Sequence, residues 1–358
     1  MNTITAAKSH ALALAAGAFF VASPLVCACA FAQSPAVRAV TGDEVAIYNL
    51  VGDANVVAGD GPSVEVSIAF AGADAHDLTI EEGSIDGRAT LRVVYPGSKF
   101  VYASMGPRSR TELRVNDDGT FPEKLNRGRK VTISGDGPGV DARADLTIRV
   151  PRGKRVRVYQ AVGEVTARDI EADLLIDTAA APAFVEAVRG AVSIDVGSGS
   201  VQALRIDGAL DIDTGSGEVN IQEVRGVAIR IDTGSGEVTG SQLTAPDIEV
   251  STGSGEVELT DIEAKHCNLD TGSGSVSVEM SSDVESMAID TGSGSVEIVV
   301  PSTLGADLYV ETGSGEVRVG VPHTDTHRSE DSFRCRIGDG RGEIRIDSGS
   351  GDVSIIDA

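Results

Sequence analysis

The segment Asp213-Thr214-Gly215-Ser216-Gly217 decides the fold, because it returns along the chain at a nearly constant interval. Its first position occurs eight times, with successive steps of 18, 19, 19, 19, 20, 21 and 36 residues, at Asp195, Asp213, Asp232, Ser251, Asp270, Asp290, Glu311 and Asp347. Repeats of this length are typical of proteins built from stacked units. Degenerate copies extend the pattern back to Asp177 and Tyr159, and a further copy is predicted at 337–344.

Apolar residues recur at three fixed places in each repeat. In the copy at Asp213 they are Leu210, Ile212 and Val219, and polar residues alternate with them. Alternation with a period of two predicts strands with one buried face. One repeat of about 19 residues cannot bury that face alone, whereas stacked repeats can. The sequence therefore predicts an all-β fold, a single-stranded parallel β-solenoid.

The same segment resembles the catalytic motif of aspartic proteases, Asp-Thr-Gly-Ser after an apolar residue. Those enzymes need two carboxylates that face each other and share a proton. Here the aspartates are predicted to follow one line, and Ser251 and Glu311 replace them without disturbing the period. We interpret the motif as a turn, in which glycines adopt backbone angles closed to other residues and Asp or Thr accepts a hydrogen bond from the turn amides.

The chain is predicted to have four parts. Residues 1–32 are typical of an export signal that ends in Ala30-Phe31-Ala32, although a membrane anchor or lipidation at Cys29 stays open. A β-rich region at 33–98 begins or caps the solenoid, a basic, loop-rich insertion occupies 99–145, and the repeats fill 146–358. No later apolar run is long enough to span a membrane. These features predict an exported protein of the periplasm, cell envelope or extracellular space.

Two cysteines remain after cleavage of the signal, Cys267 and Cys335. The alignment places them in the same inward column, three rungs apart. Three rungs correspond to roughly 14 Å, which is too far for a disulfide. We expect both to be buried fillers of the apolar core.

Charge is unevenly distributed along the chain. Residues 99–157 carry 14 Lys and Arg against 7 Asp and Glu, whereas residues 158–358 carry 12 against 37. The acidic repeats argue against nucleic acid as a partner. The basic insertion also gathers aromatic residues and is predicted either to form a binding surface or to fold onto the acidic flank. The candidate surface residues are Phe100, Tyr102, Arg108, Arg110, Phe121, Arg127 and Arg129.

The row of aspartates suggests a metal-binding site. Carboxylates about 5 Å apart repel each other, and either solvent and the turn amides or bridging calcium ions would offset the repulsion. The candidate ligands are Asp195, Asp213, Asp232, Asp270 and Asp290. A second candidate site is His323-Thr324-Asp325-Thr326-His327, whose alternative interpretation is a solvated loop.

The segments Val45-Ala46-Ile47-Tyr48-Asn49 and Val56-Val57-Ala58-Gly59, followed by repeated Asp-Thr-Gly-Ser-Gly-Glu-Val, resemble the bacterial "putative adhesin" family of unknown function. The resemblance covers roughly residues 40–358. It implies an exported or envelope-associated β-solenoid, and it transfers no functional residue.

Three functions fit these observations. The first is a non-catalytic adhesin-like or structural module that binds a surface polymer or an envelope protein. The second is a β-helix polysaccharide lyase or hydrolase, which would use carboxylates together with Lys or Arg. The third is a calcium-stabilised structural rod that associates with itself. The sequence favours the first, because no isolated catalytic constellation stands out from the repeats.

Overall fold

The computed structural model describes residues 35–121, 128–329 and 332–358. The chain divides into two units, Met1–Gln33 and Ser34–Ala358, and the described residues all belong to the second. The predicted signal peptide, with Cys29, therefore lies outside the described residues, as does Arg127. Within the described ranges there is no helix long and apolar enough to cross a membrane.

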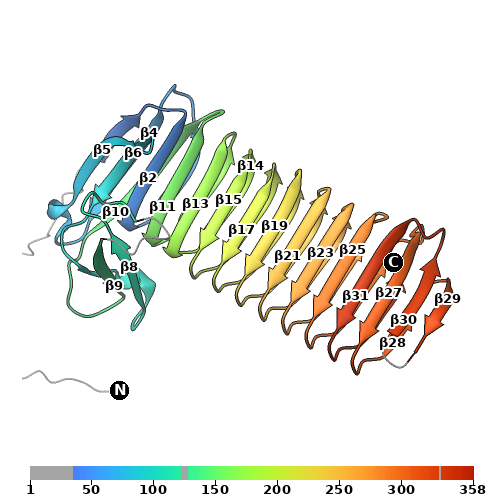
Figure 1. Ribbon diagram of the computed structural model, residues 1–358. Coiled ribbons are helices and arrows are strands. Elements are labelled where there is room, and N and C mark those ends of the chain that lie inside the picture. Colours follow the sequence, from blue (N-terminus) through green and yellow to red (C-terminus); the bar gives the residue numbers. More distant parts are fainter. Residues whose placement is uncertain (1–34, 122–127, 330–331) are drawn as a thin grey trace, which may run out of the picture. The chain divides into compact units, whose positions relative to one another are not determined.

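Two long sheets form the second unit, and successive strands of the repeats alternate between them (Figure 1). Sheet B takes the odd-numbered strands β11 (Arg155–Val162), β13 (Asp173–Ala180), β15 (Val192–Val196), β17 (Leu210–Thr214), β19 (Ala228–Thr233), β21 (Asp247–Thr252), β23 (His266–Thr271) and β25 (Ser286–Thr291). Sheet A takes the even-numbered strands β12 (Val165–Ile170), β14 (Ala183–Arg189), β16 (Val201–Asp207), β18 (Val219–Arg225), β20 (Val238–Thr244), β22 (Val257–Glu263), β24 (Val276–Met280) and β26 (Val296–Val300). Neighbours within each of these runs are parallel, so the prediction of a parallel β-solenoid is confirmed.

One rung consists of a strand of sheet B, a Gly-Ser-Gly turn and a strand of sheet A. The register stacks equivalent residues of successive rungs directly on one another, as in the pairs Ile194↔Ile212 and Asp195↔Asp213. The predicted inward isoleucines are buried, with Ile212 only 1% exposed. Burial of one such side chain contributes about 1.5–3 kcal/mol, and the ladders extend this gain from rung to rung.

The threonine after the aspartate, and not the aspartate, holds the turn together in the later rungs. The Thr271 hydroxyl accepts a hydrogen bond from the Gly274 N–H (2.9 Å) and donates one to the Gly255 carbonyl of the preceding rung (2.9 Å). The second glycine of the turn is required by close approach, because a methyl group at Gly255 would overlap the carbonyl oxygen of Gly236. The aspartate is left facing outward.

The N-terminal segment supplies the first rung. Strand β2 (Glu44–Val51) pairs in parallel with β11, and β3 (Ala54–Gly59) lies between β12 and β10 (Arg143–Pro151). Antiparallel strands extend both sheets beyond this rung: β1 (Ala36–Val40) and β4 (Val64–Ala71) in sheet A, and β5 (Thr79–Ile85) in sheet B, where it pairs with β6 (Arg88–Val94), the parallel neighbour of β2. A 3-10 turn at Ala75–Asp77 follows β4.

The predicted loop between residues 99 and 145 is more regular than expected. It contains a small three-stranded sheet of β7 (Lys99–Val101), β9 (Arg129–Ser134) and β8 (Arg110–Val115), with a 3-10 turn at Ala103–Met105. Alternating residues such as Leu113, Val131 and Ile133 form strands here, although each run is short enough to be hidden by the polar residues around it.

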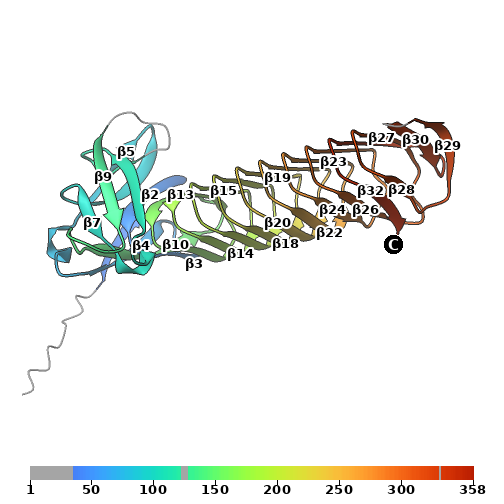
Figure 2. The same cartoon turned by 90° about the horizontal axis from the view of Figure 1, so that it is seen from below.

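The last rung is inserted out of order. Strand β31 (Gly342–Ser348) lies between β25 and β27 (Ala306–Thr312), and β32 (Val353–Asp357) lies between β26 and β28 (Val317–Val319). Figure 1 shows the order β25, β31, β27, β30 in sheet B, and Figure 2 shows β26, β32 and β28 in sheet A. Strands β25 and β27, which follow each other in sequence within sheet B, are thus separated by β31.

This order corrects the predicted repeat at 337–344. Ile337 ends β30 (Ser332–Ile337), which is antiparallel to β27, whereas Ile344 belongs to β31. Cys267 and Cys335 are buried and unpaired, as predicted, but four strand steps separate them and not three, along β23, β25, β31, β27 and β30. Residues 323–327 are exposed to solvent, as the loop interpretation expected, but they form the edge strand β29 (His323–Arg328), antiparallel to β30, and not a loop.

Candidate binding surfaces

The predicted metal-ligand aspartates form one row on the outer face of sheet B, which we call the Asp row. Asp195, Asp213, Asp232, Asp270 and Asp290 all occupy it, and Asp347 extends it beyond Asp290. Burial raises the pKa of Asp290, and the carboxylates of Asp347 and Asp270 on the flanking strands raise it further. Within residues 35–121, 128–329 and 332–358, no three His, Cys, Asp or Glu side chains are grouped to hold a metal ion. The calcium hypothesis stays a prediction.

The Asp row contributes to a hollow of about 310 Å³ at its N-terminal end. Asp177, Asp195 and Asp213 line this hollow together with Arg157 and Tyr159. The Tyr159 ring stacks on Tyr48 at a centroid distance of 4.4 Å. The first carboxylates of the row thus meet an aromatic ring and a guanidinium group, which the repeat pattern alone did not indicate.

The His-x-Asp-x-His segment brings together only two of its three predicted ligands. His323 Nε2 lies 3.0 Å from Asp325 Oδ1, while its Nδ1 lies 2.7 Å from the Val321 carbonyl. The strand pairing shifts register between Asp325 and His327, which interrupts the alternation that would have aligned all three side chains. Both ring nitrogens of His323 already face protein acceptors.

The aromatic part of the predicted binding surface is buried. Phe100, Tyr102 and Phe121 are 1%, 7% and 6% exposed, so they are unavailable to a partner. Phe100 packs edge-on against Tyr95 (5.5 Å), and Phe121 against Tyr48 (5.9 Å). The sequence showed where aromatic residues gather, but not that they form the core joining the insertion to the first rungs.

Two of the three predicted arginines that the structure describes are engaged with neighbouring groups. Arg129 donates hydrogen bonds to the carbonyls of Gly97 (2.8 Å) and Tyr95 (2.5 Å), and Arg110 forms an ion pair with Glu112. Arg108 is exposed, and its backbone N–H donates to the Asp136 carboxylate at 3.1 Å. Arg129 therefore links the insertion to the segment that precedes it.

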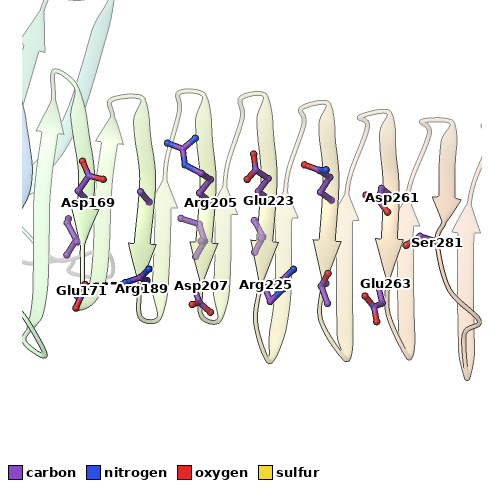
Figure 3. Close-up of a pocket in the computed structure, with 16 residues that line it drawn as sticks. Asp169, Glu171, Arg189, Arg205, Asp207, Glu223, Arg225, Asp261, Glu263 and Ser281 are labelled. Atoms are coloured by element: carbon purple, nitrogen blue, oxygen red, sulfur yellow. Dashed lines mark hydrogen bonds and ion pairs between the residues drawn. The ribbon is translucent and has the colours of Figure 1, made fainter.

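A larger depression, which we call the bend groove, runs across sheet A from β12 to β24 and has a volume of about 790 Å³ (Figure 3). It follows a kink in each of the six strands from β12 to β22. The residue at each kink is in the left-handed region although it is not glycine, with φ between 54° and 56°. These residues form the bend row: Asp169, Ala187, Arg205, Glu223, Gln242 and Asp261.

The kink changes which side chains point inward. In β16, Ala203 and Ile206 are both buried although they are three positions apart, because Arg205 takes the left-handed conformation between them. Ordinary residues are disfavoured there by roughly 1–2 kcal/mol each. The sequence carries a signal of this kink, an apolar spacing of three from Ala203 to Ile206 where alternation requires two.

Charged side chains of both signs line the bend groove in two rows. Two residues after the bend row lies a second row, the edge row: Glu171, Arg189, Asp207, Arg225, Thr244 and Glu263. Figure 3 shows the two rows on either side of the kink. Together they hold six carboxylates and three guanidinium groups, so the groove is net acidic.

Some of these charges are already paired and others are not. Arg189 bonds to Glu171 at 3.3 Å, and Arg205 forms an ion pair with Glu186. In contrast, the side chains of Asp207, Glu223, Arg225, Asp261 and Glu263 make no hydrogen bond or ion pair with the described residues. The central stretch of the groove thus offers four carboxylates and one guanidinium group to a partner.

Comparison with known proteins gives a family and one solved structure. The family model for Toastrack DUF4097 matches residues 108–356, well over half of the chain. A crystal structure of a "putative cell adhesion protein" from Clostridium sporogenes is 11% identical, covering 90% of this chain and 99% of its own, with a TM-score of 0.19. Among curated proteins, none matches the sequence significantly.

Proposed function

Because the chain belongs to the Toastrack DUF4097 family, we propose that it is a non-catalytic, exported, adhesin-like module that binds a polymer or protein of the cell envelope. The observation that carries this proposal is the bend groove, which repeats the same pair of outward positions on successive rungs. A surface of this kind suits an extended partner, because each rung adds one further contact of similar geometry. The match to a cell adhesion protein agrees with this proposal but adds no argument to it.

The rigidity of the groove supports binding. Its floor is a parallel sheet whose side chains below are buried, such as Ile206, Val224 and Ile262. A partner therefore orders few protein groups on binding, and less interaction energy is lost to conformational entropy. The unpaired charges then act as recognition points along the sheet.

Binding is tested with an array of cell-envelope polymers and envelope proteins, using the purified chain. We expect saturable binding to at least one class, weakened by salt because the groove is charged. Binding to no class at any ionic strength would contradict the proposal. Export is tested separately by the mass of the protein recovered from the organism, where cleavage after Ala32 is the expected result.

The enzymatic alternative, a β-helix lyase or hydrolase, has its own measurement. Incubation of the chain with each polymer that it binds is expected to leave the polymer length unchanged. Release of new chain ends above that seen with an Asp207→Asn, Glu223→Gln double variant would replace binding by catalysis as the function.

A further inference from the structure

We propose that the bend groove binds an extended polypeptide segment of net positive charge, lying across the strands of sheet A. The inference rests on the proposed binding function and names its partner class. It is carried by the charges that the protein leaves unpaired in the groove, by their order along the rungs and by the groove's dimensions.

The unpaired side chains indicate the sign of the partner's net charge. Asp207, Glu223, Asp261 and Glu263 form no ion pair with the described residues, and they lie on three strands, β16, β18 and β22. Like charges at this spacing repel each other unless a partner neutralises them. Lysine or arginine side chains of a partner would both bind and relieve this repulsion.

The order of the charges points to a partner that carries both signs. Arg225 stands in the edge row between Asp207 on β16 and Thr244 on β20, so the acidic surface is interrupted at β18. A uniform polycation would meet this guanidinium group with like charge. A polypeptide can place a carboxylate there and cations on either side, so complementarity would fix its register.

The lining residues also disfavour other polymers. None of the side chains that line the groove is aromatic, so it lacks the flat faces on which nucleobases stack. The groove crosses seven strands, β12 to β24, which at about 4.8 Å per step span roughly 29 Å. An extended segment of about nine residues has this length.

The bend row gives the groove a fixed shape. Left-handed residues such as Arg205, Glu223 and Asp261 persist only where the surrounding structure holds them, and here the strands on both sides do so. Figure 3 shows these side chains in one line across the strands and the edge row, with Asp207, Arg225 and Glu263, in a second line. The two rows are therefore preorganised for a chain lying between them.

A charge exchange tests the inference. One probe is a peptide of about nine residues with a central glutamate flanked by lysines, and the second has a central lysine instead. The unchanged chain is expected to prefer the glutamate peptide, and Arg225→Glu to prefer the lysine peptide, with each exchange altering Kd by about three- to tenfold at low ionic strength. The measurement is fluorescence anisotropy of the labelled peptides.

Arg230→Glu provides the matched control, because Arg230 is equally basic and exposed but lies on sheet B. It changes the net charge by the same amount and should leave the preference for the glutamate peptide unaltered. An equal effect of Arg230→Glu, or no exchange of preference with Arg225→Glu, would overturn the inference.

The same variant separates this inference from the proposed function. If an envelope target binds Arg225→Glu as tightly as the unchanged chain, the groove assignment is wrong while the binding function stands. If the array yields no target but the peptides follow the exchange, the envelope proposal fails and the groove remains assigned to polypeptide.

Discussion

The Asp and Thr residues that precede each Gly-Ser-Gly turn have different roles. Thr271 is buried and hydrogen-bonds to two rungs, whereas Asp270 beside it faces outward. Alternation along the strand explains this division, since neighbouring side chains must point to opposite faces. From the sequence, either residue could accept a hydrogen bond from the turn amides. The threonine does so because it lies on the inner face.

We expect Thr271→Val to destabilise the protein by about 1–3 kcal/mol. The substitution preserves shape but leaves the Gly274 N–H and the Gly255 carbonyl without their partner. The control is Thr233→Val, because the buried Thr233 hydroxyl has no partner among the described residues and its loss should be neutral or stabilising. Urea unfolding measures both, and equal effects would show that the hydrogen bonds of Thr271 contribute nothing.

For the bend row we expect the opposite effect, a gain in stability on mutation. Ala187 has φ of 56°, and glycine adopts this conformation without the steric cost of a Cβ atom. We expect Ala187→Gly to raise the free energy of unfolding by about 0.5–1 kcal/mol. Ala228→Gly in β19, which is absent from the left-handed set, should lower it instead. A loss at both positions would contradict the interpretation.

Asp290 gives the Asp row a pH dependence. Its pKa is raised in the folded state, so the folded protein favours the protonated form. This contribution to stability is present at acidic pH and is lost as pH rises through the folded pKa. Asp290→Asn should therefore raise the free energy of unfolding, and with it Tm, at pH 7, by less than about 1 kcal/mol because the site is mostly exposed, and have little effect near pH 3. A lower Tm of Asp290→Asn at pH 7 would show that the ionised row is stabilised.

At the scale of elements, the repeat strands were predictable and the C-terminal ones were not. Columns such as Ile194, Ile212 and Ile231 specify strand, face and register together, because each rung copies its neighbour. Position along the chain no longer identifies the neighbour after β25, where β31 and not β27 follows in space. Ile344 and Leu308 suit the same column, so the pattern permits either order.

One trace of this order is present in the sequence. The step from Asp290 to Glu311 is 21 residues, the longest of the six regular steps. The connection between β26 and β27 must pass an extra rung, which adds roughly 4.8 Å. The connection at 301–305 has five residues, but so does the one at 281–285, which passes no extra rung, so the length alone does not identify the inserted rung.

Disulfide trapping distinguishes the two orders. Ala288 in β25 is paired with Arg345 in β31, and Arg345 with Tyr309 in β27. We expect an Ala288→Cys, Arg345→Cys variant to cross-link on mild oxidation, because directly paired residues lie within disulfide range. An Ala288→Cys, Tyr309→Cys variant should not. Cross-linking of the second pair would restore the sequential order.

The two native cysteines should not interfere with this assay. Burial raises the pKa of Cys267 to about 12 and that of Cys335 to about 11, so both are thiols at neutral pH. Thiolates are the reactive form in disulfide exchange. The unchanged chain, oxidised in parallel, is expected to give no cross-link.

For the molecule as a whole, charge opposes the compact state. The chain has a formal net charge of −24, and residues 158–358 hold 37 acidic against 12 basic side chains. Self-repulsion of this size weakens folding and is screened by salt. We expect Tm to rise between 10 and 150 mM NaCl, by about a few degrees. A falling Tm would indicate that the surface ion pairs, such as Arg230–Glu249, outweigh the repulsion.

Composition predicted this imbalance, and the periodicity predicted the fold class, but the aromatic part of the predicted binding surface is buried. Aromatic and basic residues in 99–145 suggested a surface, yet packing buries Phe100 and Phe121. The bend groove instead combines residues from seven strands, and each of its side chains looks like an ordinary polar position in its own repeat. Only their alignment across the sheet, together with the kink, makes a site.

The inserted last rung limits where repeats can be duplicated in evolution. Duplication of one repeat between Tyr159 and Asp290 adds a rung between two that are neighbours in both sequence and space. Duplication after Asp290 adds residues where β31 must still return to lie beside β25. Lineages of this protein should therefore vary in repeat number upstream of β25, while the segment from β25 to Ala358 is inherited as one block.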